Sequence, residues 1–170
     1  MRKLFAFILS ILLLAALAGC GGGPAKPTDP ANPGGGEPGF CFEPKGVKIV
    51  MGAHPDTALP ALGEALHSFE KPSCAINARD TTYNYPGFDL TVTYPDRGED
   101  YITNITFADD TYFTAEGITI GSDFDEVMAA YGTDYEEVKG HYTYTRGRST
   151  LEIAIIGGAV EQIIYDYLFD

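Results

Sequence analysis

Five short segments occur twice along the chain in the same order, and this internal repetition limits the possible folds more than any other feature of the sequence. The paired segments share their hydrophobic pattern and are 46–49 with 117–120, 59–63 with 128–132, 83–85 with 142–144, 90–92 with 151–153, and 102–107 with 160–165. The offset between paired segments falls from 71 to 58 residues, mainly because the first copy has a longer connection at 64–80. We therefore predict two copies of one structural unit, at about 46–110 and 117–170.

Each copy begins with a short strand that is followed by one helix. In the second copy Ser122 is a suitable N-cap, and Gly132 is a suitable end for the helix. The apolar residues between them recur at the spacing of one helical face and are Phe124, Val127, Met128 and Tyr131. In the first copy the sequence predicts a helix that begins near Asp56 or Thr57 and ends at Gly63.

The rest of each copy has the alternating pattern of antiparallel strands. Phe88, Leu90 and Val92 alternate with polar residues, and Gly157–Gly158 is a strong hairpin signal. A sheet with one apolar face needs a cover, which one helix in each copy would supply. We therefore predict an α+β fold of two tandem units, each a helix packed on an antiparallel β-meander.

The N-terminal segment has the features of an export signal. Arg2 and Lys3 precede an apolar run over 4–16, and small residues lead directly into Cys20. The run is shorter than the roughly 20 residues that span a membrane as a helix. A short cationic segment, an apolar run and small residues before a cysteine are typical of a lipoprotein signal. We therefore predict a signal peptide at 1–19 and a lipid on Cys20.

Glycine and proline are abundant in residues 20–39, which predicts a flexible linker before a globular domain at 40–170. The chain has 24 acidic and 11 basic residues and a net charge of −13. Such acidity excludes nucleic acid as a partner, because that binding depends on lysine and arginine. The lipid on Cys20 is therefore expected to be the attachment to the cell membrane, with the domain on its extracytoplasmic face.

A tandem helix-and-meander unit behind such a signal and linker resembles the β-lactamase-inhibitor-like fold group and the SmpA/OmlA (BamE-type) lipoprotein unit. The segments 72–75, 83–95 and 117–121 are also similar to those of a group of uncharacterised lipoproteins of Gram-positive bacteria. The first resemblance implies a concave sheet rich in aromatic residues that grips a partner enzyme. The second implies an assembly role at an outer membrane. Neither resemblance brings catalytic residues with it.

Two cysteines remain besides Cys20. In an exported protein Cys41 and Cys74 are a candidate disulfide pair, and the alternative is two small buried apolar side chains. The three histidines lack the spacing of a zinc site, and the acidic segments do not match an EF-hand loop, so no metal or cofactor is expected. The sequence contains no G-x-S-x-G or S-x-x-K motif, so we predict no catalytic residues.

Tyrosine supplies the candidate binding surface. Four of the 11 tyrosines occupy matching positions in the two copies and are Tyr83, Tyr85, Tyr142 and Tyr144. Tyrosine is enriched at protein interfaces, although it is also common on half-buried strands. We therefore predict a non-enzymatic, lipid-anchored surface protein that binds another protein or a cell-envelope component. The alternatives are an extracytoplasmic hydrolase of a cell-wall or secreted polymer that uses a carboxylate pair, and a passive surface protein without a specific ligand.

Overall fold

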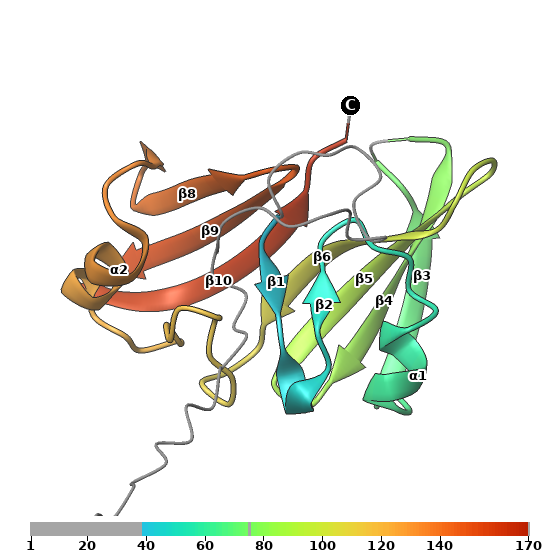
Figure 1. Ribbon diagram of the computed structural model, residues 1–170, viewed down its shortest axis with the longest axis horizontal. Coiled ribbons are helices and arrows are strands. Elements are labelled where there is room, and N and C mark those ends of the chain that lie inside the picture. The colour runs from blue at the N-terminus through green and yellow to red at the C-terminus, as the bar shows by residue number, and fades with distance from the viewer. Residues whose placement is uncertain (1–38, 75, 170) are drawn as a thin grey trace, which may run out of the picture.

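The computed structural model describes residues 39–74 and 76–169. The predicted signal peptide at 1–19, Cys20 and the predicted linker up to residue 38 lie outside these residues. Eight strands form one antiparallel sheet in the order β3-β4-β5-β6-β10-β9-β8-β7 (Figure 1). Their bounds are His67–Pro72 for β3, Ala78–Tyr85 for β4, Phe88–Pro95 for β5, Tyr101–Phe107 for β6, Glu136–Val138 for β7, His141–Arg146 for β8, Ser149–Ile156 for β9 and Ala159–Tyr167 for β10.

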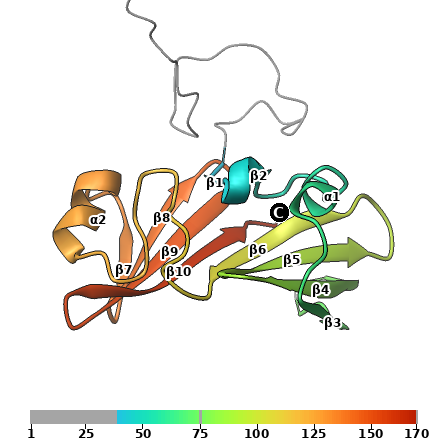
Figure 2. The same cartoon turned by 90° about the horizontal axis from the view of Figure 1, so that it is seen from below.

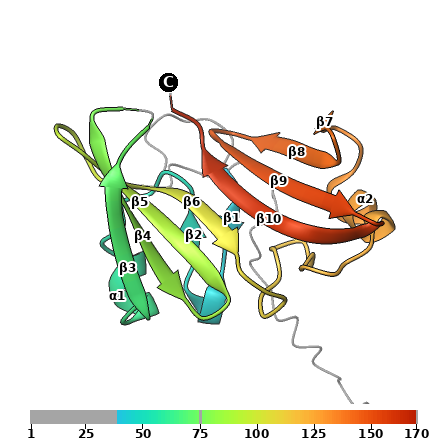
Figure 3. The same ribbon diagram turned by 180° about the vertical axis from the view of Figure 1, so that it is seen from behind.

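The other elements lie on one side of this sheet (Figure 2). They are a hairpin of β1 (Cys41–Phe42) and β2 (Ile49–Val50) with a 3-10 turn at Pro44–Gly46, and the helices α1 (Ala58–Leu62) and α2 (Phe124–Tyr131). No helix of the described residues packs on the opposite face (Figure 3). The sheet therefore has a covered face and an open face.

The predicted α+β fold of two helix-on-meander units is wrong. Each half of the chain forms a four-stranded meander, β3–β6 or β7–β10, but the last strands of the two meanders pair with each other. Thr106, Ile105 and Asn104 of β6 lie opposite Ile164, Tyr165 and Asp166 of β10. All eight strands consequently form one sheet and the fold is mostly β. The helices, of five and eight residues, are too short to cover such a sheet.

The two meanders nevertheless repeat the same contacts. The N–H of Gly52 donates to the carbonyl of Ile102, and the N–H of Gly121 donates to the carbonyl of Val160, both at 2.8 Å. Matched residues of β6 and β10 are buried alike, and these pairs are Ile102 with Val160, Ile105 with Ile163, and Phe107 with Tyr165. The internal repetition therefore reflects the local structure of each half, while the pairing of β6 with β10 decides the overall fold.

Helix α2 has a different N-cap from the one predicted. Asp123 is the N-cap, because its side chain accepts a hydrogen bond from the N–H of Glu126 at 2.9 Å. The carboxylate of Glu126 accepts from the N–H of Asp123 at 3.0 Å, which completes a capping box. Ser122 Oγ instead accepts a hydrogen bond from the N–H of Thr119 at 3.2 Å. The predicted end at Gly132 is confirmed.

The predicted strand pattern and hairpin are also confirmed. Phe88, Leu90 and Val92 are at most 1% exposed and belong to the core. Gly157 and Gly158 connect β9 to β10, and Ile156 lies opposite Ala159 on either side of this turn. Two glycines can take the positive φ angles that such a turn requires, here 65° and 92°.

The β1–β2 hairpin covers the centre of the core. The sequence predicted a short strand at 46–49, which overlaps β2, but it did not predict β1 or the hairpin, and the matching strand predicted at 117–120 is not formed. The ring centroid of Phe42 lies 5.1 Å from that of Phe88 in the first meander and 6.3 Å from that of Tyr165 in the second. The N–H of Phe40 donates to Ser149 Oγ on β9 at 2.7 Å. The N-terminal hairpin therefore joins both halves of the sheet through one aromatic cluster.

A polar cluster on the covered side attaches the segment before α2 to the sheet. The carboxylate of Glu116 accepts hydrogen bonds from Arg146 Nη1 at 2.9 Å and from the Tyr131 hydroxyl at 2.8 Å. The guanidinium of Arg146 also stacks over the ring of Phe40, at 4.3 Å from its centroid. Burial raises the pKa of Tyr131. These contacts connect α2, β8 and the N-terminal segment, so we assign them a structural role.

Candidate functional site

Two of the four predicted surface tyrosines belong to the core. Tyr85 and Tyr144 are each 4% exposed. Their hydroxyls donate to the carbonyl oxygens of Gly63 and Gly132, which follow α1 and α2, at 3.4 and 3.2 Å. Burial raises the pKa of Tyr85 and raises that of Tyr144 to about 12. Both rings thus hold the end of a helix to the sheet.

The other two tyrosines are half-buried beside them on the covered face. Tyr83 lies opposite Leu90 on β5, and Tyr142 lies opposite Ile153 on β9. Side chains that lie opposite each other in an antiparallel pair share one face of the sheet, so these tyrosines point to the same face as the core. The predicted exposed stripe of tyrosines is therefore not found in the described part of the chain.

The candidate disulfide pair is not joined in the structure. Cys74 is an exposed free thiol in the connection between β3 and β4. Cys41 is 5% exposed and lies in β1, on the covered side of the sheet. The sheet separates the two side chains, because Cys74 lies on its open side. Cys20 lies outside the described residues, so its lipidation stays a prediction.

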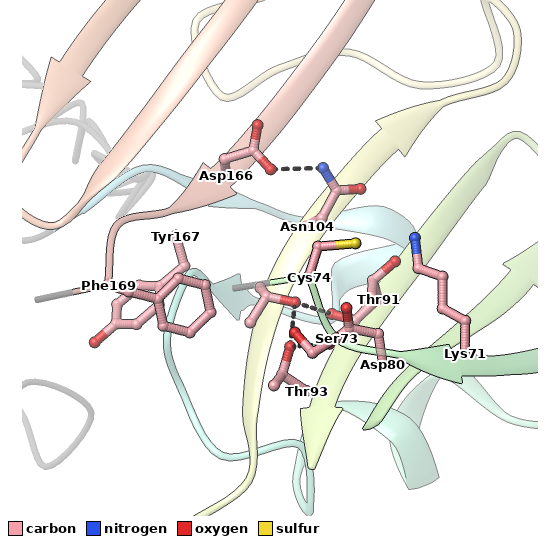
Figure 4. Close-up of a pocket in the computed structure, with 11 residues that line it drawn as sticks. Lys71, Ser73, Cys74, Asp80, Thr91, Thr93, Asn104, Asp166, Tyr167 and Phe169 are labelled. Carbon is pink, nitrogen blue, oxygen red and sulfur yellow. Dashed lines mark hydrogen bonds between the residues drawn. The ribbon is translucent and has the colours of Figure 1, made fainter. Parts of the chain in front are cut away.

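A groove of about 340 Å³ opens on the open face of the sheet (Figure 4). Its walls come from the end of β3 and the following connection, from the centres of β4, β5 and β6, and from the C-terminal end of β10. We call it the polar groove. Its lining includes Lys71, Asp80, Thr93, Asn104, Asp166 and Tyr167.

The strand register brings these polar side chains together. Asp80 lies opposite Thr93 on β4 and β5, and Asn104 lies opposite Asp166 on β6 and β10. The apolar pattern of each strand predicts the core and therefore does not reveal this site. The signal was present in the alternate positions, where Asp89, Thr91 and Thr93 form the polar half of the β5 pattern.

Hydrogen bonds fix the side chains of the polar groove. The Thr93 hydroxyl is buried and lies 2.7 Å from Asp80 Oδ1 and 3.0 Å from the Thr103 hydroxyl. Asn104 Nδ2 donates to Asp166 Oδ1 at 2.7 Å (Figure 4). Each aspartate uses one carboxylate oxygen in these bonds, and both aspartates line the groove. The groove therefore contains two carboxylates held by hydrogen bonds, together with one cationic side chain, that of Lys71.

Burial raises the pKa of Asp166. The hydrogen bond from Asn104 acts in the opposite direction, and the charge of Glu152 adds to the rise. A carboxylate whose pKa is raised is less stable in its ionised form in the folded protein than in the unfolded chain. The ionised form of Asp166 is therefore disfavoured by its surroundings in the groove.

We expect the substitution Asp166→Asn to raise the free energy of unfolding at pH 7 and to leave it unchanged near pH 3. The folded pKa of Asp166 is above its unfolded value, so its stabilisation is complete below the unfolded pKa and is lost as the pH rises through the folded pKa. Asparagine stays neutral and can accept the same hydrogen bond from Asn104. Urea unfolding of both proteins at pH 3 and pH 7 measures the difference.

Asp109 provides the matched control for this experiment. Hydrogen bonds from Thr111 lower the pKa of this exposed aspartate. Asp109→Asn is therefore expected to leave the free energy of unfolding unchanged or to lower it at pH 7, the opposite direction. Equal effects of the two substitutions would contradict the conclusion that ionised Asp166 destabilises the folded protein.

The described residues contain no cluster of potential metal ligands. None of their His, Cys, Asp and Glu side chains form a group of three or more that could hold a metal ion. His141 Nδ1 instead lies 2.8 Å from Glu152 Oε1 on the open face. None of the helices over residues 39–74 and 76–169 has the length and apolar character needed to cross a membrane.

Known proteins give no further guidance: no family model, curated protein or solved structure matches the chain. The resemblances suggested by the sequence pattern therefore stay predictions.

Proposed function

We propose that this protein is a lipid-anchored, extracytoplasmic binding module that catalyses no reaction. The lipid on Cys20 would attach it to the cell membrane, and a protein or cell-envelope partner would bind in the polar groove. The observation that carries the proposal is the pair of aspartates that hydrogen bonds hold in that groove, Asp80 with Thr93 and Asp166 with Asn104. The tyrosines of the covered face have no part in it.

The chemistry of the groove favours a partner that presents hydrogen-bond donors. Asp80 and Asp166 supply carboxylate oxygens, which accept bonds from hydroxyl and ammonium groups. The rings of Tyr167 and Phe169 lie together at one end of the groove and offer an apolar surface (Figure 4). Because the polar side chains are already held in place, binding would cost little side-chain entropy.

Crosslinking in intact cells tests this proposal. The double variant Asp80→Asn and Asp166→Asn keeps the shape of both side chains and removes their charges. We expect it to lose the crosslinked partner of the wild-type protein, because charged hydrogen bonds are the stronger ones. Thermal unfolding of the purified variant shows whether the fold is retained.

The matched control is the double variant Glu99→Gln and Glu161→Gln, which removes two charges from exposed side chains outside the groove. It is expected to keep the crosslinked partner. Loss of the partner in both variants would indicate an effect of net charge alone. An unchanged partner profile in the groove variant would contradict the proposal, and a wild-type protein with no partner would favour the passive surface protein.

One observation favours the hydrolase as a second candidate. Asp80 and Asp166 line the same groove, and the raised pKa of Asp166 is the property of a general acid. A hydrolase would release soluble fragments from isolated cell-envelope polymer, and Asp166→Asn would abolish that release. A binding module would retain the polymer without releasing fragments.

A further inference from the structure

A second groove lies on the covered side of the sheet, between β4 and the segment that connects α1 to β3. It has a volume of about 460 Å³. Polar and apolar surface line it about equally, and its apolar part comes from Leu59, Ala65, Leu66 and the rings of Tyr83 and Tyr85. We call it the α1 groove.

The other half of the molecule has the same arrangement of helix, glycine and tyrosine around the equivalent position. Gly63 after α1 and Gly132 after α2 have φ angles of 80° and 76°, and the carbonyl of each accepts a hydrogen bond from a tyrosine hydroxyl. The first strand of each meander begins four residues after this glycine, at His67 and at Glu136. Its first residue lies opposite Asn84 in β3–β4 and opposite Thr143 in β7–β8. Leu66 and Tyr135, the residues that precede these strands, are therefore equivalent.

The side chains of these two equivalent residues differ in their contacts and in their exposure to solvent. The ring of Tyr135 packs edge-on against Tyr142 and Tyr144, with centroid distances of 5.0 and 5.7 Å. Leu66 is instead 67% exposed, and the matching tyrosines, Tyr83 and Tyr85, line an open groove. The first half thus has the two tyrosines that match Tyr142 and Tyr144, but it has no aromatic ring at the position of Tyr135 to pack on them.

We propose that the α1 groove binds an aromatic side chain of a partner polypeptide, in the position that Tyr135 occupies in the other half of the molecule. Edge-on aromatic pairs add favourable energy beyond the area they bury. The adjacent strand β3 ends the sheet and all six of its residues are exposed, so the segment next to the aromatic residue can pair with its outer edge.

The composition of the chain indicates which occupant the α1 groove takes. Residues 21–38 contain no aromatic residue, so the linker of the same chain cannot fill it. A second copy is disfavoured because each chain carries a net charge of −13. Glu64 is exposed at the rim of the groove. A basic residue beside the aromatic residue of the partner would complement this charge.

Binding of short peptides to the full chain tests this proposal. The probes are acetyl-Arg-Tyr-Arg-amide and acetyl-Arg-Ala-Arg-amide, and the measurement is the shift of backbone amide signals in NMR titrations. We expect the tyrosine peptide to shift the signals of 63–68 and 83–85. The alanine peptide should bind about tenfold more weakly, because it lacks the ring that forms the aromatic pair.

Two substitutions at Leu66 separate filling of the groove from loss of a surface side chain. Leu66→Tyr supplies the missing ring from within the chain and is expected to weaken binding of the tyrosine peptide about tenfold. Leu66→Ser removes the same leucine without filling the groove and is expected to keep the binding. In addition, Tyr135→Leu is expected to create a new site, with peptide-dependent shifts in 132–136 and 142–144.

Three outcomes would overturn the proposal. These are equal binding of the two peptides, equal binding by the two Leu66 variants, and shifts of the same signals on raising the protein concentration without peptide. The last result would assign the groove to a second copy of the chain. The double variant Asp80→Asn and Asp166→Asn leaves the α1 groove intact, so this test and that of the polar groove can fail separately.

Discussion

Replacement of Phe42 by alanine is expected to lower the free energy of unfolding by about 3–5 kcal/mol, the usual cost of removing a buried phenylalanine ring. Phe42 is 1% exposed and contacts rings from both meanders, so its removal leaves a cavity at the centre of the core. Domains of this size are commonly stable by about 5–15 kcal/mol. Urea unfolding followed by circular dichroism measures the change.

Phe113→Ala is the control for this prediction. Phe113 is 59% exposed, so its truncation is expected to change the free energy of unfolding by less than about 0.5 kcal/mol. A Phe42→Ala protein as stable as the Phe113→Ala protein would mean that the β1–β2 hairpin is not part of the cooperative core. The two halves of the sheet would then be held together by β6 and β10 alone.

The second large effect is expected at Gly52. Its φ is +80°, and a Cβ at this position would overlap the ring of Tyr167. Alanine in the left-handed region costs about 1–2 kcal/mol, and overpacking adds about 1–3 kcal/mol. Gly52→Ala is therefore expected to lower the free energy of unfolding by about 2–5 kcal/mol in the same measurement.

The repeat supplies a matched control for this substitution. Gly121 makes the equivalent backbone hydrogen bond in the second half and has a φ of +92°, but a Cβ there would have no heavy atom within 4 Å. Gly121→Ala should therefore cost only the backbone term of about 1–2 kcal/mol. In a Tyr167→Ala background the extra cost of Gly52→Ala should disappear. Equal costs at the two glycines would show that the ring of Tyr167 moves away freely.

Much of the local structure was predicted because it depends on neighbouring residues, although the short strand expected at 117–120 is not formed. The end of α2 at Gly132, the alternation in β5 and the turn at Gly157–Gly158 follow from backbone preferences and from the periods of helices and strands. The N-cap of α2 was wrong by one residue, since both Ser122 and Asp123 can cap a helix. Only the two reciprocal hydrogen bonds between Asp123 and Glu126 identify Asp123 as the N-cap.

The overall fold was not predicted because it depends on a contact between the two copies. Nothing in the sequence of either copy shows that β6 pairs with β10 and so merges two meanders into one sheet. The packing of the N-terminal hairpin on the sheet was not predicted for a related reason. Phe42 lies in a two-residue strand with no periodicity to detect, and Phe40 comes directly before it, yet both rings pack against the sheet.

The candidate site shows the same division between local and long-range information. The sequence placed Tyr83 and Tyr142 at equivalent positions, but their exposure depends on which face the hairpin and the helices cover. Once the core is known, the polar half of each strand pattern predicts the open face. Asn104 and Asp166 are 62 residues apart in sequence, and only the register of β6 and β10 brings them together.

The position of the N-terminal hairpin also decides how the domain responds to mechanical load. In the proposed anchored form, tension on the tether would enter the folded domain at Gly39 and act directly on Phe40, which is bonded to Ser149, and on Phe42 in the core. Tension applied there would have to extract two buried rings before any strand of the sheet could peel away. Because the β1–β2 hairpin lies on the covered side of the sheet, the polar groove of the open face is on the side away from this hairpin (Figure 2).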